Sequence, residues 1–349
     1  MPTHRISWSW SPAAQEDCVQ RADNLVEALS ESARDRASSA ASITVEAAER
    51  MRAWINAQDE SWSFSAAAAD LEAGWGEWAH HQGWRGPCAA WIDALRCTYR
   101  EARDAGGAPG PRQALLTELD AWLAEAPADV PRHQGESREA GFAARTRLGR
   151  PEDVCPHALR RLGREETILI HGYSETALGV VTAAQKAGLF PEVLLAQGAA
   201  DQSGLRSARH LANHGVRVRL AWDVAVVANV DEVDRIWLGT EAVGAGAFLA
   251  PVGTSLLLEQ AERLEVPAAV LCTVDKLVPG GSVQLPPWGE EESWNLWAYA
   301  PEGVELSSQP LERVDAEKIG LWLTEAGEET LAEFCTRGLK PYPAPPCVA

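Results

Sequence analysis

The chain has 349 residues, of which 46% are hydrophobic, and its formal net charge is −19 at pH 7. Domains average about 100–200 residues, so this length predicts two of them, and the hydrophobic fraction excludes wholesale disorder. The strong negative charge disfavours a nucleic-acid partner, because each phosphate contact needs a cation and the field of the whole protein repels phosphate.

The cysteine pattern and the hydropathy favour a cytoplasmic location. The seven cysteines are scattered and contain no CxxC pair, which predicts reduced thiols rather than a disulfide framework or a zinc site. The first 14 residues lack the apolar core of a signal peptide, and no apolar run reaches the length of about 18 residues that spans a membrane. We therefore expect a cytoplasmic protein with no membrane segment, no metal site and no cofactor.

Residues 1–150 are predicted to form an all-helical domain. From Ser42 to Ile55 apolar residues recur at helical spacing, and Ser42 is the expected N-cap. Further helices are expected over Ala13–Arg36, Ala66–Trp78, Pro87–Ala105 and residues 115–123, with a loop over Pro127–Glu139. Nine of the fifteen tryptophans lie before residue 123. Such side chains either fill the core and subunit contacts, which is the interpretation we favour, or form an aromatic binding surface.

After Glu166 short apolar runs alternate with helical segments. Strands are expected over Thr167–Ile170, Glu192–Ala196, Val216–Trp222, Arg235–Leu238 and Pro267–Thr273. Helices are expected over Glu175–Ala187, Ser203–His214, Val224–Asn229 and Thr254–Leu264. For residues 151–349 this alternation predicts a Rossmann-like α/β domain, a mainly parallel sheet with helices on both faces. Ligands of such sheets bind at the carboxyl ends of the strands, so the loops that follow the strands carry the candidate site.

Polar residues and glycines in these loops are the candidate site residues. The ligand-binding candidates are His171, Gly172, Tyr173, Ser174, Ser203, Gly204, Asp223, Gly253 and Thr254, and Glu241 is the candidate for catalysis. A purely structural interpretation competes with this one: Ser174 and Asp223 would cap helices, His171 would be a buried structural histidine and Glu241 a solvated loop residue. Lys276 is either a phosphate contact or a simple loop charge, and we favour the loop charge.

The order of these loops resembles a known family. Ile168–Ser174, Asp201–Gly204, Asp223, Gly239–Val243 and Val252–Thr254 are similar to the successive motifs of the family that sugar-phosphate aldose–ketose isomerases share with the α/β/δ regulatory subunits of initiation factor 2B. The resemblance extends from Thr167 to Gly338, and Val314–Ala326 looks like the closing helix and turn of the family. It implies the Rossmann-like fold and a homodimer.

The resemblance also implies where chemistry would lie. The isomerases that act on methylthioribose 1-phosphate or ribose 1,5-bisphosphate use a cysteine of the first loop and an aspartate of the fourth loop as an acid/base pair. A basic residue of the second loop and a lysine before the Gly-Thr pair bind phosphate. This chain has other residues at those four positions, which are Gly172, Glu241, Ala199 and Pro251.

These departures predict a regulatory or scaffold protein that is not a catalyst and that binds a sugar phosphate or a nucleotide. Arg206 and Arg209 lie close to the second loop in the sequence and are candidate replacements for the lost cations. Two alternatives stay open: an isomerase with an altered active site in which Glu241 is the base, and a protein that acts on an unphosphorylated substrate.

Overall fold

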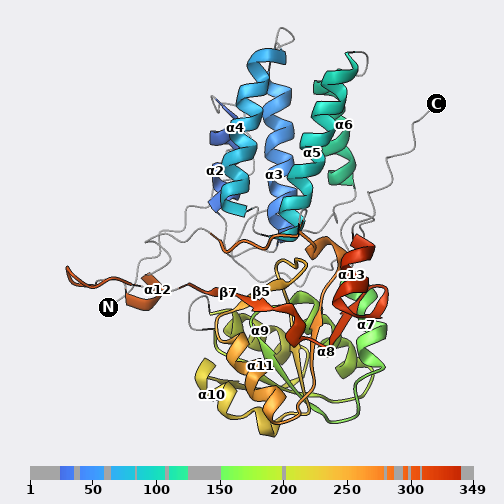
Figure 1. The fold of residues 1–349 in the computed structure, drawn as a ribbon, viewed down its shortest axis with the longest axis vertical. Helices are drawn as coiled ribbons and strands as arrows, with labels where there is room; N and C mark the ends of the chain where they lie inside the picture. The colour runs from blue at the N-terminus through green and yellow to red at the C-terminus, as the bar shows by residue number, and fades with distance from the viewer. Residues whose placement is uncertain are drawn as a thin grey trace. The chain divides into compact units, whose positions relative to one another are not determined.

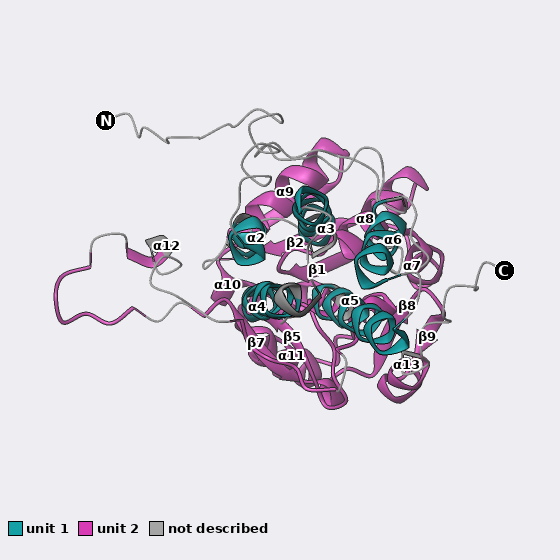
Figure 2. Cartoon of the chain, turned by 90° about the horizontal axis from the view of Figure 1, so that it is seen from above, with its two compact units in different colours: residues 1–83, 87–145 teal, residues 84–86, 146–349 magenta. Residues whose placement is uncertain are grey.

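The computed structural model describes residues 24–34, 40–58, 64–82, 85–106, 110–124, 151–198, 202–278, 281–286, 294–297, 300–306 and 309–338. The chain divides into two compact units (Figure 2). One unit comprises residues 1–83 and 87–145, and the other comprises residues 84–86 and 146–349.

The first unit is built from helices (Figure 1), and large aromatic side chains fill its core. Its described helices are α2 (Leu25–Arg34), α3 (Ala40–Ala57), α4 (Phe64–Gln82), α5 (Gly86–Ala105) and α6 (Pro111–Ala124). Trp54, Trp75, Trp78 and Trp91 are fully buried. Trp78 and Trp91 meet edge to face with ring centroids 5.0 Å apart, a favourable aromatic geometry. The expectation that tryptophans fill the core of this half is therefore confirmed for these four.

Helix α3 begins at Ala40, so Ser42 lies inside the helix and the prediction that it is the N-cap is wrong. Alanine is the strongest helix former, which explains why the helix extends through Ala40 and Ala41. The predicted segment Ala13–Arg36 is described only over α2 and its neighbouring Asn24, and the predicted loop Pro127–Glu139 lies outside the described residues.

The second unit contains the predicted Rossmann-like sheet. Its strands are β1 (Thr167–His171), β2 (Glu192–Ala196), β3 (Arg217–Ala221), β4 (Arg235–Leu238), β6 (Ala268–Leu271), β8 (Leu321–Thr324) and β9 (Gly327–Glu329). They are ordered β3-β2-β1-β4-β6-β8-β9, and every neighbouring pair is parallel except β8 and β9. The fold class inferred from the alternation of short apolar runs and helices is thereby confirmed.

Helices cover both faces of this sheet. They are α7 (Pro151–Leu159), α8 (Glu175–Lys186), α9 (Ser203–Asn213), α10 (Asp223–Ala228), α11 (Thr254–Arg263) and α13 (Leu331–Gly338). Successive residues of a strand point to opposite faces. Leu169 therefore packs in one core with α10, α11 and α13, whereas Ile168 and Ile170 pack in the other with α7, α8 and α9.

The C-terminal part of the prediction was wrong. Val314–Ala326 is not a helix and turn: it contains the end of β7 (Leu311–Asp315), the 3-10 turn Ala316–Lys318 and strand β8. Strand β7 pairs antiparallel with β5 (Ala247–Pro251), a strand that was not predicted. Short apolar runs cannot be assigned to strand or helix by periodicity alone, and in β8 the tertiary environment decides, because Trp322 is fully buried between Phe248 and Phe334.

Candidate functional site

The carboxyl ends of β1, β4 and β6 lie at one edge of the sheet, because these strands are parallel neighbours. The loops and helices that follow bring together a set of side chains that we call the charged cluster, whose members are Arg85, Glu175, Arg206, Glu241 and Lys276. Glu241 follows β4, Lys276 ends the 3-10 turn η2 (Val274–Lys276) after β6, and Glu175 begins α8 after β1. The cluster therefore lies where parallel sheets bind their ligands.

Glu241 and Lys276 form the central ion pair of the charged cluster. Lys276 Nζ lies 3.7 Å from Glu241 Oε2, and the two side chains are only 22% and 32% exposed. Burial alone would raise the pKa of Glu241, but the positive charges of Lys276 and Arg85 hold it below its usual value. Burial would likewise lower the pKa of Lys276, but Glu241 and Asp275 raise it. Glu241 is therefore not a solvated loop residue, and Lys276 is more than the simple loop charge that we favoured.

Glu175 is a cluster member that sequence reasoning missed. Burial raises its pKa, and the negative charge of Glu241 raises it further against the opposing effect of Lys276. The pKa values of the two carboxyl groups of the cluster are thus shifted in opposite directions. The shift favours the protonated form of Glu175 and the ionised form of Glu241. The sequence feature that could have identified Glu175 is its position directly after Ser174, a predicted residue of the first loop.

In the loop after β1, Tyr173 contacts a member of the charged cluster, whereas Ser174 has a structural role. The Arg206 guanidinium lies over the Tyr173 ring, 4.9 Å from its centroid, and burial, followed by Glu175, raises the pKa of Tyr173 to about 12. Ser174 is the N-cap of α8, and its Oγ accepts a hydrogen bond of 3.2 Å from the Ala177 N–H. The structural interpretation of Ser174 therefore holds in this structure.

Polar contacts of His171 connect three loops, because its ring nitrogens face Thr254 and Asp223. His171 is 6% exposed, and its Nδ1 lies 3.1 Å from Thr254 Oγ1. The Thr254 hydroxyl donates to the Pro251 carbonyl at 2.7 Å, so its single proton is used and Nδ1 must be the donor to Oγ1. His171 Nε2 faces Asp223 Oδ1 at 3.7 Å, and this oxygen accepts the Gly198 N–H at 3.0 Å.

The predicted glycines are positions where a side chain does not fit. Gly172 has a φ of +88°, and a Cβ there would lie 2.5 Å from Pro251 Cγ. A Cβ at Gly204 would lie 1.8 Å from the Ala196 carbonyl oxygen. Gly253 has a φ of +98° and precedes α11 as its N-cap, while Ser203 is buried at the start of α9. The three glycines shape the loops and have no side chain to bring to the charged cluster.

Of the two arginines proposed as replacement cations, Arg206 is the one whose charge acts on Glu175 and Glu241. Arg209 is exposed further along α9. Ala199 lies outside the described residues, as does Asp201.

A cavity of about 560 Å³ lies at the opposite edge of the sheet, where β4, β6 and β8 begin. Its basic residues are each paired with a carboxylate: Arg161 with Glu328, Arg235 with Glu166 and Lys318 with Glu259. Because this cavity lies where the strands begin, whereas parallel sheets bind ligands where the strands end, we place the candidate site at the charged cluster and not in this cavity.

The fold defines a Rossmann-like protein, and the charged cluster is its candidate site at the carboxyl ends of the parallel strands. Residues 132–327 match the model of the Initiation factor 2 subunit family (IF-2B), which covers more than half of the chain. The chain belongs to this family, as the ordered loop motifs predicted.

Relatives of two kinds are similar to this chain. The chain is 33% identical over 129 residues to the ribose 1,5-bisphosphate isomerase of Haloferax volcanii, covering 37% of this chain and 40% of that protein. It is 34% identical over 89 residues to the translation initiation factor eIF2B subunit alpha of Dictyostelium discoideum, covering 25% of this chain and 28% of that protein. The chain thus spans less than half the length of these two relatives.

Solved structures show the same fold. The tetrameric eIF2B-beta2-delta2 complex from C. thermophilum contains a chain that superposes with a TM-score of 0.61 at 14% sequence identity, covering 94% of this chain and 98% of that chain. Among the described residues, none of the helices combines the length and the apolar character needed to cross a membrane.

Proposed function

We propose that this chain is a regulatory or scaffold protein of its family that binds a small phosphorylated metabolite, a sugar phosphate or a nucleotide, at the charged cluster without converting it. The observation that carries the proposal is the ion pair of Lys276 and Glu241 beside Arg206 at the ligand-binding edge of the sheet. Lys276 and Arg206 supply the positive charge that a phosphate dianion requires. The buried Oε2 of Glu241, which accepts no hydrogen bond from the described residues, offers an acceptor to a sugar hydroxyl.

Gly172 supports binding without catalysis. The resemblance places it where the isomerases have their cysteine, and glycine has no group that transfers a proton. Its left-handed φ and its closeness to Pro251 mean that a larger residue would fit only after a local rearrangement. Pro251 in turn occupies the position of a phosphate-binding lysine and offers no charge.

One observation favours a second candidate function, a sugar-phosphate aldose–ketose isomerase with an altered active site. Glu175 and Glu241 share the charged cluster and their pKa values are displaced in opposite directions. This is the pattern of a general acid and a general base. In this alternative Glu175 donates a proton to the ring oxygen as the sugar 1-phosphate opens, and Glu241 removes the proton from C2. The C2 hydroxyl then loses its proton and C1 gains one, which gives the ketose.

A thermal-shift panel with ribose 1,5-bisphosphate, methylthioribose 1-phosphate, AMP, GDP and unphosphorylated ribose tests both candidates. We expect one phosphorylated compound to raise the melting temperature, because a ligand at a hundredfold excess over its dissociation constant adds about 2.7 kcal/mol of stability. Ribose is the matched control for the phosphate group and should give no shift. Absence of a shift with every phosphorylated compound would contradict both candidates.

The compound that binds is then incubated with the protein and followed by proton NMR. A compound that stays unchanged supports the regulatory protein. Conversion to a ketose phosphate that is lost in Glu241→Gln supports the isomerase and overturns the proposal of a non-catalytic protein.

We propose further that the protein works in the cytoplasm as a homodimer. Strand β3 is one of the two edge strands of the sheet, and Leu220 in it and Trp222 and Val224 directly after it are 42%, 71% and 79% exposed. An edge strand that carries exposed apolar side chains is a surface that other chains cover. A second copy of this chain is the occupant that the family resemblance implies.

Trp222→Asp is expected to convert the dimer to a monomer, because it places a charge at the centre of this apolar surface. Sedimentation velocity of the purified chain measures the change. Trp297→Asp is the matched control, since Trp297 is another exposed tryptophan and belongs to a different element, the short helix α12 (Trp294–Trp297). A Trp222→Asp variant that sediments like the unmodified dimer would exclude this surface.

A further inference from the structure

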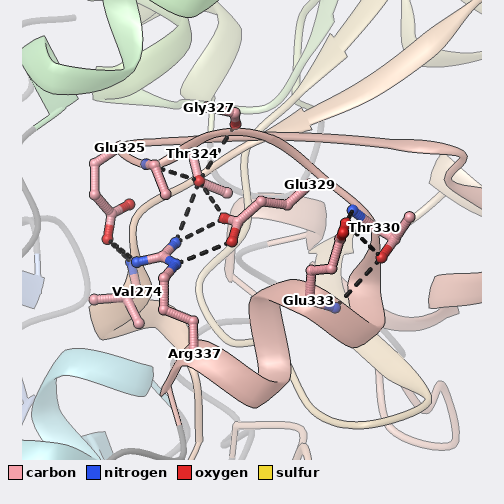
Figure 3. A network of polar contacts seen from close by, with 9 residues as sticks. Val274, Thr324, Glu325, Gly327, Glu329, Thr330, Glu333 and Arg337 are labelled. Carbon is pink, nitrogen blue, oxygen red and sulfur yellow. Dashed lines mark hydrogen bonds and ion pairs between the residues drawn. The ribbon is translucent and has the colours of Figure 1, made fainter.

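A network of charged side chains centred on Arg337 of α13 lies after β8, outside the charged cluster (Figure 3). Arg337 Nη1 donates to Glu325 Oε1 at 2.7 Å. Its Nε and Nη2 donate to the two carboxylate oxygens of Glu329 at 3.0 and 2.8 Å, and Nη2 also reaches Thr324 Oγ1 at 3.2 Å. A planar guanidinium that binds several acceptors at once fixes their relative positions.

The three charged groups of this network are largely withdrawn from water. The side chain of Arg337 is 27% exposed, and those of Glu325 and Glu329 are 18% and 11% exposed. Burial would raise the pKa of Glu329, but hydrogen bonds from Arg337 and Thr324 lower it, so this carboxylate stays ionised. Partly buried ion pairs of this kind are sensitive to the loss of either partner.

Glu325 connects this network to the charged cluster. Its Oε1, the atom that Arg337 holds, also accepts the Val274 N–H at 3.1 Å. Val274 is the first residue of the turn η2, and Lys276 is its last. The opposite side of the turn is bound to the loop after β4, where Val243 N–H donates to the Lys276 carbonyl at 2.7 Å. The turn that carries Lys276 is thus held between Glu325 and the loop that carries Glu241.

We propose that Glu325 and Arg337 are positioning residues for the site, which hold the Val274–Lys276 turn so that Lys276 Nζ faces Glu241. The consequence for ligand affinity rests on the proposed function, whereas the placement of Lys276 does not. A phosphate group would meet Lys276 at the position that the Arg337–Glu325–Val274 chain of contacts sets. The C-terminal helix α13 thereby becomes a determinant of the binding site without touching the ligand.

The chain contains four lysines, Lys186, Lys276, Lys318 and Lys340, so the environment of Lys276 can be measured directly. Reductive methylation of the full chain with ¹³C-formaldehyde gives one NMR signal set per lysine, and Lys276→Arg assigns the set of interest. The charged groups that face Lys276 are Glu241, Asp275, Glu175 and Arg85. In the unmodified chain we expect Lys276 to titrate above its usual range, since its carboxylate neighbours outweigh the effect of burial.

In Glu325→Ala we expect the titration of Lys276 to move down toward the usual range and its labelling by acetic anhydride to become several-fold faster. Lys186 and Lys318 serve as internal references. Glu325→Gln keeps an oxygen that accepts the Val274 N–H but loses the charge that binds Arg337, so an intermediate effect is expected. If Glu325→Ala does not fold, Glu325→Gln and Arg337→Lys carry the test, since Arg337→Lys keeps the charge and loses the multidentate contacts.

Glu333→Ala is the matched control that separates a general loss of α13 stability from a specific loss of Lys276 placement. Glu333 Oε2 accepts the Thr330 N–H and hydroxyl at 2.8 and 2.9 Å in the first turn of the same helix. This variant is expected to destabilise α13 and to leave Lys276 unchanged. Unchanged Lys276 behaviour in the Glu325 and Arg337 variants, or an equal change in Glu333→Ala, would overturn the proposal.

A second arm of the experiment measures the affinity for ribose 1,5-bisphosphate by calorimetry. Several-fold weaker binding in Glu325→Ala, with unchanged binding in Glu333→Ala, supports positioning of a working site. If the unmodified chain binds no phosphorylated compound while the Lys276 signals move as expected, the proposed function fails and the positioning role stands.

Discussion

Replacing Lys276 with methionine is expected to abolish binding of a phosphorylated ligand and to destabilise the protein. The variant leaves Glu241 Oε2 buried without its nearest positive charge. An unsatisfied charged group of this kind costs about 1–3 kcal/mol, and partial exposure of the pair keeps the loss below that of a fully buried one. Calorimetric titration with the compound found in the thermal-shift panel measures the binding, and urea unfolding measures the stability.

The stability loss in Lys276→Met should depend on pH. The folded-state pKa of Glu241 is lowered, so its contribution is present above the unfolded value of about 4.3 and is lost as the pH falls through the folded value. The folded-state pKa of Lys276 is raised, so its contribution is complete below the unfolded value of about 10.4 and is lost as the pH rises through the folded value. The difference from the unmodified chain should therefore be greatest near neutral pH and shrink toward both extremes.

Lys276→Arg is the control for charge, since it keeps a cation of similar length beside Glu241. It should retain most of the stability, although a guanidinium does not reproduce the compact geometry of an ammonium group. If Lys276→Met is as stable as the unmodified chain at pH 7 and binds the ligand equally well, then the ion pair contributes neither to the fold nor to the site.

Replacing Gly204 with alanine is expected to lower the free energy of unfolding by about 2–4 kcal/mol, because the new methyl group overlaps backbone. A Cβ at this position would lie 1.8 Å from the Ala196 carbonyl oxygen. Ala196 ends β2, which is paired on one side with β1 and on the other with β3, so it cannot move aside easily. Helix α9 must shift instead, at the expense of the 3.0 Å bond from Gly204 N–H to the Gln197 carbonyl.

Gly179→Ala is the matched control for Gly204→Ala. Gly179 lies within α8, and a Cβ there would meet nothing within 4 Å. Alanine in a helix interior is more stable than glycine by about 0.5–1 kcal/mol, so this variant should be slightly stabilised. Urea unfolding of the two variants compares them directly, and equal stabilities would show that the close approach at Gly204 is relaxed at no energetic cost.

The main elements of the α/β half were predictable because their signals are local. Strands such as Thr167–Ile170 are short buried runs, and the helices between them carry an apolar stripe, so each element reveals its type within a few residues. The parallel arrangement follows from their alternation. Strands β5, β7, β8 and β9 were not recognised. Strands β5 and β8 are short apolar runs, whose composition is the same in a buried strand and in a buried helix, and β7 and β9 are rich in charged residues and have no apolar run.

The candidate site was predictable only in part. The sequence alone located the loops at the carboxyl ends of the strands and showed the departures at Gly172 and Pro251. It did not show that Glu175 belongs to the charged cluster or that Lys276 is paired with Glu241. It left open whether Ser174 caps a helix or binds a ligand, and the structure shows that its hydroxyl caps α8.

The sequence by itself determined the type and order of the elements and the edge of the sheet at which a ligand would bind, because backbone preference and apolar periodicity act over a few residues. Only the tertiary structure decided which charges meet. Glu325 reaches Val274 across 51 residues of sequence, and His171 reaches Thr254 across 83. Such pairs depend on how strands are ordered in the sheet and how deeply each side chain is buried, and no local pattern encodes either quantity.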